Sequence, residues 1–140
     1  MAEMSLELAE KCIRRGRTKA QQLGIQISIA VVNDAGELIA FARMKQRRGG
    51  FNERKTIAKA KTAVAYRKDT KEIMEEFANR PGNYFIVGMS AMYPGDFWAG
   101  PGGAPIVMDG GLVGAVGVSG SSPENDHECA VAASKVMEAD

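Results

Sequence analysis

The chain of 140 residues contains little of three residue types that often carry chemistry or cross-links: aromatic residues, cysteine and histidine. Aromatic side chains make up 6% of the sequence, and eight methionines supply part of the expected core. Two cysteines, Cys12 and Cys129, are too few for a disulfide framework and predict buried, reduced thiols in a cytoplasmic protein. A single histidine, His127, cannot form a multi-histidine metal site, and no Cys/His spacing predicts a zinc site.

Long apolar runs are absent as well. No stretch approaches the roughly 18 apolar residues that a membrane-spanning helix needs, and the N-terminus lacks the apolar run of a signal peptide. Hydrophobic residues at 45% and charged residues at 25% are close to the average of globular proteins. We therefore expect one soluble, cytoplasmic domain over residues 1–140, with no membrane partner.

Positive charge is scarce in the second part of the chain. Residues 1–80 hold 17 of the 18 lysines and arginines, whereas residues 81–140 hold all five prolines and 11 of the 16 glycines. This asymmetry favours a basic helical layer on a turn-rich sheet, or contact between opposite ends of the chain within a subunit or across a homo-oligomer interface. Nucleic acid is not an expected partner, because no aromatic stacking motif accompanies the basic residues.

The predicted helices follow from apolar spacing and from end signals. Gly24 follows the first amphipathic segment, where a helix commonly ends in a left-handed residue. Asn52 can cap the second helix, and Ser122 with a proline behind it predicts the start of the last one. The helices are expected over residues 4–22, 52–67, about 69–79 and from 122 towards the C-terminus.

The predicted strands are segments where apolar residues alternate, or short apolar runs bounded by turns. Two tight turns, at residues 33–36 (NDAG) and 109–111 (DGG), join strands into hairpins. Hairpins make a sheet mainly antiparallel, and the helices must cover it, which predicts an α+β fold. The strands are expected over residues 25–32, 37–43, 84–89, 104–109 and 112–119.

The many glycines do not form a nucleotide-binding motif. No helix starts at a G-x-G-x-x-G turn and no Walker sequence is present, so the sequence itself requires no organic cofactor. Gly114 and Gly117 lie inside a predicted strand, where glycine indicates the close approach of another backbone, a bulge or a ligand. Both close packing and ligand approach remain open.

A group of basic residues is a candidate binding site for a carboxylate. Arg43 ends the second predicted strand, Arg47 and Arg48 follow in a loop, and Lys59 lies near the apolar stripe of the next helix. Arginine could bind a carboxylate in a bidentate manner and lysine as a point charge. The alternative, a solvated basic face, is favoured for Arg47, Arg48, Lys55 and Lys61.

The start of the last helix carries acidic residues and the histidine. Glu124, Asp126 and Glu128 could simply stabilise the helix through its dipole, or they could bind a cation or supply a general base. His127 could be a helix-surface residue, an axial haem ligand or a general acid or base.

Several ordered motifs resemble those of the GlcG/HbpS family, which includes the C-terminal domain of PduO-type proteins and is often labelled haem-degrading. The resemblance runs from about residue 6 to 137. It rests on the hairpin VVNDAGELIAFARM (31–44), the helix KAKTA (59–63), the loop and strand GGAPI (102–106), the hairpin with VGAVGVSG (113–120) and the helix start END (124–126).

The resemblance implies a five-stranded antiparallel sheet flanked by helices, in a profilin- or PAS-like sandwich, and a homo-oligomer. It also implies that loops around Gly103 and Asp126 line a pocket, often where subunits meet. Some family members bind haem or a corrinoid, and others accompany glycolate, diol or aromatic catabolism.

Two functional hypotheses result, beside a purely structural assembly subunit. In the first, a homo-oligomeric protein binds haem, another tetrapyrrole or a similar small molecule with carboxylates, with a role in its degradation. Arg43 and Lys59 would pair with the carboxylates. Gly102 and Gly103 would allow close approach, and His127 would ligate the iron. The ring-stacking candidates are Tyr93, Phe97 and Trp98.

In the second hypothesis, the protein is a cofactor-independent isomerase, hydratase or lyase that acts on a small carboxylate or an aromatic catabolite. Asp126 or Glu124 would be the general base, and His127 a further acid or base. Arg43 or Lys59 would hold the substrate carboxylate, and the Gly103 amide would help to stabilise an enolate oxygen.

Overall fold

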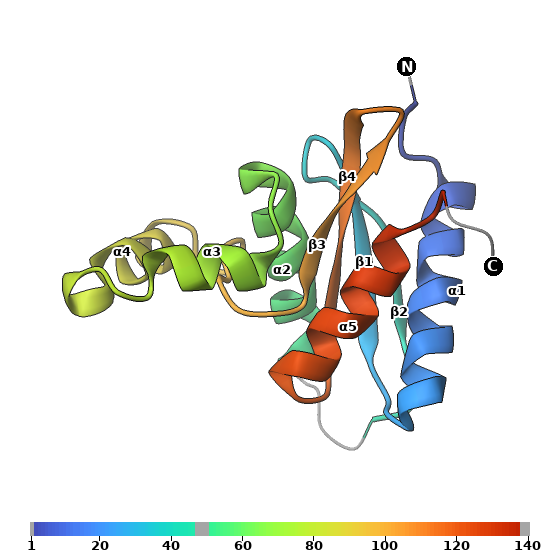
Figure 1. Cartoon of the computed structure of the whole chain (residues 1–140), viewed down its shortest axis with the longest axis horizontal. Helices are drawn as coiled ribbons and strands as arrows, with labels where there is room; N and C mark the ends of the chain where they lie inside the picture. Colours follow the sequence, from blue (N-terminus) through green and yellow to red (C-terminus); the bar gives the residue numbers. More distant parts are fainter. Residues whose placement is uncertain (1, 47–50, 138–140) are drawn as a thin grey trace.

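A four-stranded antiparallel sheet with the order β2-β1-β4-β3 is the centre of the structure (Figure 1). The structure is a computed structural model and describes residues 2–46 and 51–137. The elements in chain order are α1 (Leu6–Leu23), β1 (Ser28–Asn33), β2 (Leu38–Arg43), α2 (Asn52–Tyr66), α3 (Thr70–Phe77), the 3-10 turn η1 (Pro81–Asn83), α4 (Tyr84–Met92), β3 (Gly103–Met108), β4 (Gly111–Ser119) and α5 (Pro123–Ser134). The predicted α+β class with an antiparallel sheet between helices is therefore confirmed.

Helices cover both faces of the sheet. Helices α1 and α5 pack together on one face, and α2 lies on the other, against β1, β4 and β3. Helices α3 and α4 extend away from the sheet on the side of α2 (Figure 1). None of the helices within residues 2–46 and 51–137 is long and apolar enough to cross a membrane.

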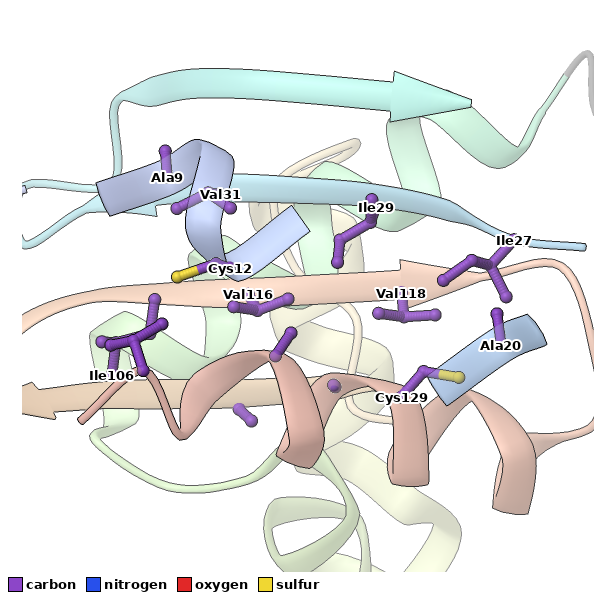
Figure 2. Close-up of a cluster of buried hydrophobic side chains, with 14 of the residues drawn as sticks. Ala9, Cys12, Ala20, Ile27, Ile29, Val31, Ile106, Val116, Val118 and Cys129 are labelled. Carbon is purple, nitrogen blue, oxygen red and sulfur yellow. The ribbon is translucent and has the colours of Figure 1, made fainter. Parts of the chain in front are cut away.

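The larger apolar core lies between the sheet and the helices α1 and α5. Branched side chains of β1 and β4, such as Ile29 and Val118, point towards Cys12 of α1 and Cys129 of α5 (Figure 2). Both thiols are free and buried, as expected. Burial raises the pKa of Cys12 to about 12 and that of Cys129 to about 11, so neither thiol ionises near neutral pH.

Small residues bring α2 very close to the other face. A Cβ atom at Gly117 of β4 would overlap the carbonyl oxygen of Thr56 in α2, and one at Gly114 would overlap the carbonyl oxygen of Val32 in β1. The glycines of this strand are therefore explained by the close approach of protein backbone, the first of the two alternatives that the sequence left open. Ala60 and Ala63 complete this thin interface.

Local signals set most element boundaries. Gly24 ends α1 with a φ of 69°, and the Ser122 side chain caps α5 by accepting a hydrogen bond from the Asn125 N–H at 3.2 Å. Asp109 and Gly110 form the β3–β4 turn with φ of 53° and 79°. The predicted cap at Asn52 is wrong, because Phe51 takes the N-cap position and α2 has no side-chain cap.

The prediction of five strands is also wrong, because the sheet has four. Residues 84–89, predicted as a strand, belong to α4. A short apolar run has no period that separates a strand from a helix. Away from the sheet a strand would leave its backbone groups without partners, whereas a helix satisfies its own. Phe85 then anchors α4 by stacking on Phe77 of α3, with 4.0 Å between ring centroids.

Candidate functional site

A buried ion pair lies where α2, β4 and α5 meet. Lys59 of α2 is 3% exposed and Asp126 of α5 is 4% exposed. The Lys59 Nζ donates hydrogen bonds to the carbonyl oxygen of Val118 at 2.8 Å and to the Asp126 Oδ2 at 3.3 Å. The other oxygen of Asp126 accepts a hydrogen bond from the Ser121 N–H at 3.0 Å. The pair thus joins three elements through one network.

Glycine makes room for this lysine. A Cβ atom at Gly102 would lie 2.9 Å from the Lys59 Nζ and 2.5 Å from the Val118 carbonyl oxygen, and the residue has a φ of 121°. At the next position, a Cβ atom at Gly103 would lie 2.5 Å from the Lys59 carbonyl oxygen. The two glycines are therefore required by the backbone conformation and by the close approach of α2.

Burial acts against both charges of the pair. Desolvation lowers the pKa of Lys59, and the attraction of Asp126 opposes that shift. Desolvation likewise raises the pKa of Asp126, opposed by the charge of Lys59. Both groups are therefore closer to their neutral forms than exposed lysine and aspartate are.

A cleft of about 410 Å³ opens above the pair. Lys59 and Asp126 are part of its lining, together with residues of α3, α4 and the loop before β3. Lys55, one turn before Lys59, places its ammonium 5.7 Å from the centre of the Trp98 ring, a cation–π distance. The lining includes Lys55, Met74, Ile86, Ser90, Trp98, Pro101 and Ser121. The site thus has an ionisable floor, apolar walls and one further cation.

The structure brings some of the predicted site residues together and separates others. Lys59, Asp126 and Gly102 meet at the floor of the cleft. Gly103 is next to them, but its N–H already donates to the Thr70 Oγ1 at 2.8 Å. Tyr93 lines a different cavity of about 560 Å³, near Asp34 and Tyr66.

Arg43 and Glu124 lie outside the lining of this cleft. Arg43 is exposed at the end of β2, the edge strand farther from β3, and Glu124 is exposed in the first turn of α5. Arg47 and Arg48 lie outside the described residues.

His127 is half-buried beside the floor of the cleft but does not line it. Its Nδ1 is buried and has no hydrogen-bond partner within residues 2–46 and 51–137. Its charge interacts with Asp69, the N-cap residue of α3, where burial raises the pKa of the carboxyl and His127 opposes the shift. Its surroundings therefore include the start of α3.

Of the residues in the walls of the cleft, sequence reasoning identified Trp98 as a possible ring-stacking partner and missed the others. Lys55 was expected on the solvent side of its helix, yet it is part of the lining of the cleft. Met74 and Ile86 come from α3 and α4, whose position against α2 no motif indicates. The i, i+4 spacing of Lys55 and Lys59 was the one signal available, since it places both lysines along one side of α2.

Fold and site together define an α+β protein whose antiparallel sheet carries a buried lysine–aspartate pair beneath an open cleft. The chain belongs to the HbpS-like family, described as that of the haem-degrading protein HbpS, and the match spans residues 4–135.

Individual relatives agree with this assignment. The protein GlcG of Escherichia coli K12 is 33% identical over 124 residues, covering 83% of this chain and 81% of its own. A double mutant of HbpS from Streptomyces reticuli has a solved structure with a TM-score of 0.82 and 26% identity, over 99% of this chain and 90% of the other. The solved complex of PduOC with haem has a TM-score of 0.82 and 28% identity, over 96% and 95% of the two chains.

We expect strong energetic coupling between Lys59 and Asp126. Lys59→Met or Asp126→Asn alone leaves one buried group without its partner, which should lower the free energy of unfolding by about 3–5 kcal/mol. The double variant should lose clearly less than the sum of the two losses. Urea denaturation of all four proteins measures this coupling.

A second ion pair on the same helix provides the control. Lys61 and Asp96 lie 3.0 Å apart with side chains that are 35% and 57% exposed. Lys61→Met and Asp96→Asn should each change the free energy of unfolding by less than about 1 kcal/mol. Additive losses at Lys59 and Asp126 would show that the two buried groups do not depend on each other.

Proposed function

We propose that this protein binds a flat small molecule with carboxylate groups in the cleft above Lys59 and Asp126, and that haem is the first candidate. The observation that carries the proposal is the cleft itself, with apolar walls, a cation at Lys55 and an ionisable floor. The solved haem complex of PduOC supports haem as the ligand. The family description supports a role in haem degradation.

The residues around the cleft suit haem. Met74, Ile86 and Trp98 offer apolar and aromatic surface to a macrocycle, and Lys55 could pair with a propionate. Two side chains could ligate iron: the Met74 thioether in the lining, and the His127 imidazole, whose buried Nδ1 has no hydrogen-bond partner in the described part of the chain. When bound, haem supplies an iron centre for redox or oxygen chemistry.

We also propose that the protein is a homo-oligomer, because α4 is apolar and has no buried residue in the isolated chain. Tyr84, Val87 and Met92 are 60%, 62% and 70% exposed. An apolar surface of this kind typically marks an interface. Because Ile86 and Ser90 of the same helix line the cleft, a subunit packed on α4 would lie beside the ligand site.

A second candidate is a cofactor-independent isomerase, hydratase or lyase that acts on a small carboxylate or an aromatic catabolite. The buried carboxyl of Asp126 favours it, because burial raises the pKa of that group and makes its carboxylate a stronger general base. Lys55 and Lys59, rather than the distant Arg43, would then attract the substrate carboxylate.

Haem titration followed at the Soret band tests the first candidate. We expect a saturable shift at about one haem per chain, and loss of the shift in His127→Ala if the imidazole ligates the iron. Lys55→Gln should raise the Kd about tenfold by removing a charged partner of a propionate. Arg43→Gln, a matched change outside the lining, should leave the Kd unchanged. A flat titration of the wild-type protein would rule out haem.

Light scattering after size-exclusion chromatography tests the oligomer. The wild-type protein should elute as a multimer, and Val87→Glu should shift it to the monomer by placing a charge in the apolar surface of α4. Leu6→Glu, at a residue of α1 that is 55% exposed, is the control and should not change the mass. A monomeric wild-type protein would contradict the proposal.

A screen of small hydroxy acids and ring-cleavage products tests the enzyme. Asp126→Asn should lower the turnover of any substrate found by about a hundredfold or more, because the general base is removed. Circular dichroism must show that the variant is folded, and Lys61→Gln should retain full activity. Unchanged turnover in folded Asp126→Asn would exclude this carboxyl as the base.

A further inference from the structure

Two of the three hydrogen-bonding positions of the Lys59 nitrogen are directed at protein acceptors. A lysine nitrogen has three tetrahedral positions besides its bond to Cε. Two of them point to acceptors, the Val118 carbonyl oxygen at 2.8 Å and the Asp126 Oδ2 at 3.3 Å, and these are the only two acceptors recorded among the described residues. A neutral amine donates two hydrogens and keeps one lone pair. When the amine is neutral, the lone pair therefore lies at the third position.

The space beside this nitrogen is kept open by glycine. A Cβ atom at Gly102 would lie only 2.9 Å from the Nζ, so any side chain there would crowd the amine. Lys59 is nevertheless part of the lining of the cleft of about 410 Å³, together with Asp126 and Gly100. A small molecule in the cleft can therefore meet the amine and the carboxyl together.

The surroundings also favour the reactive form of the amine. Burial lowers the pKa of Lys59, and the nearby ammonium of Lys55 acts in the same direction. Only the unprotonated amine is a nucleophile, so both effects raise the reactive fraction at neutral pH. The charge of Asp126 opposes this lowering of the Lys59 pKa. Its carboxylate is also a proton acceptor, 3.3 Å from the Lys59 nitrogen.

We propose that the Lys59 Nζ is a nucleophile that forms an imine with a small aldehyde or ketone bound in the cleft. Lys55 in the lining of the cleft favours carbonyl compounds that also carry a carboxylate. This activity goes beyond haem binding and does not depend on it. It also differs from general-base catalysis, because the lysine makes a covalent bond to the substrate.

The reaction balances without an oxidant or a further co-reactant. The Nζ lone pair attacks the carbonyl carbon, and the electron pair of the C=O bond moves to oxygen. The Asp126 carboxylate takes a proton from nitrogen and returns it to that oxygen, which gives a neutral carbinolamine. The nitrogen lone pair then expels the hydroxyl group, while Asp126 takes the remaining proton from the nitrogen and delivers it to the hydroxyl group, which leaves as water. One amine and one carbonyl compound thus give one imine and one water.

Reductive trapping of the wild-type protein tests this inference. Succinic semialdehyde is added at neutral pH with sodium cyanoborohydride, which reduces an imine to a stable secondary amine, and peptide mass spectrometry locates the adduct. We expect Lys59 to be labelled about tenfold faster than Lys61, because burial lowers the pKa of Lys59 and a neutral amine is the reactive form. Lys61 is the matched control on the same helix, more exposed and paired with Asp96.

Variants separate the roles of the individual groups. Lys59→Arg keeps a positive charge but has no primary amine, so the fast phase of labelling should disappear in a folded variant. Asp126→Asn should slow labelling of Lys59 by about tenfold or more, because the proton relay is removed. Butanal has the same chain length as succinic semialdehyde but no carboxylate. In the wild-type protein butanal should label Lys59 more slowly than succinic semialdehyde does, and this difference between the two aldehydes should shrink in Lys55→Gln.

Labelling of Lys61 with no adduct on Lys59 would overturn the inference, and so would equal rates at both lysines. Because the labelled sites are mapped in the wild-type protein, this result does not depend on whether any variant folds. The haem titration is a separate measurement. An adduct on Lys59 without a Soret shift would support imine formation and reject haem binding. A Soret shift without an adduct on Lys59 would support haem binding and reject imine formation.

Discussion

The buried pair of Lys59 and Asp126 is the interaction on which the arrangement of the site depends. It fixes α2 to the start of α5 and, through the Val118 carbonyl, to the end of β4. Two charged groups that are nearly inaccessible to water are stable only while each satisfies the other. Gly102 must then pass close to the lysine, which places the loop before β3 over the pair. Four segments of the chain, α2, the loop before β3, the end of β4 and the start of α5, therefore meet at one point.

The two faces of the sheet have different roles. The face under α1 and α5 contains the larger branched side chains and two inert thiols, so it supplies most of the apolar burial. The face under α2 has glycine and alanine, which let a helix backbone lie almost directly on β4. One face thus stabilises the fold, and the other positions a lysine with little freedom to move.

Much of this architecture follows from local sequence. Turn residues such as Asp109 and Gly110, the cap at Ser122 and the alternation in β1 predicted both hairpins and most element boundaries. The lysine, the aspartate and Gly102 were also identified in advance, although as a ligand site rather than as a mutual pair. Residues 84–89 were misread because an isolated apolar run has no periodicity that decides between strand and helix.

The walls of the cleft could not be predicted, because they depend on where α3 and α4 lie in space. Ile86 belongs to α4, which packs on α3 through Phe85 and Phe77, and the Trp98 backbone N–H donates to the Thr62 Oγ1 of α2 at 2.9 Å. No linear motif encodes these contacts between separate segments. The same reason explains why Arg43 and Tyr93, both reasonable candidates by residue type, lie elsewhere.

The direct contact of α2 with β4 has a consequence for how this fold can diverge. Because Gly117 leaves no side chain between the helix and the strand, a change at the floor of the cleft must also disturb the thin interface. The walls contributed by α3 and α4 are free of that constraint, since they lie outside both core clusters. Proteins of this architecture can therefore exchange one ligand for another by replacing wall residues while the floor stays the same.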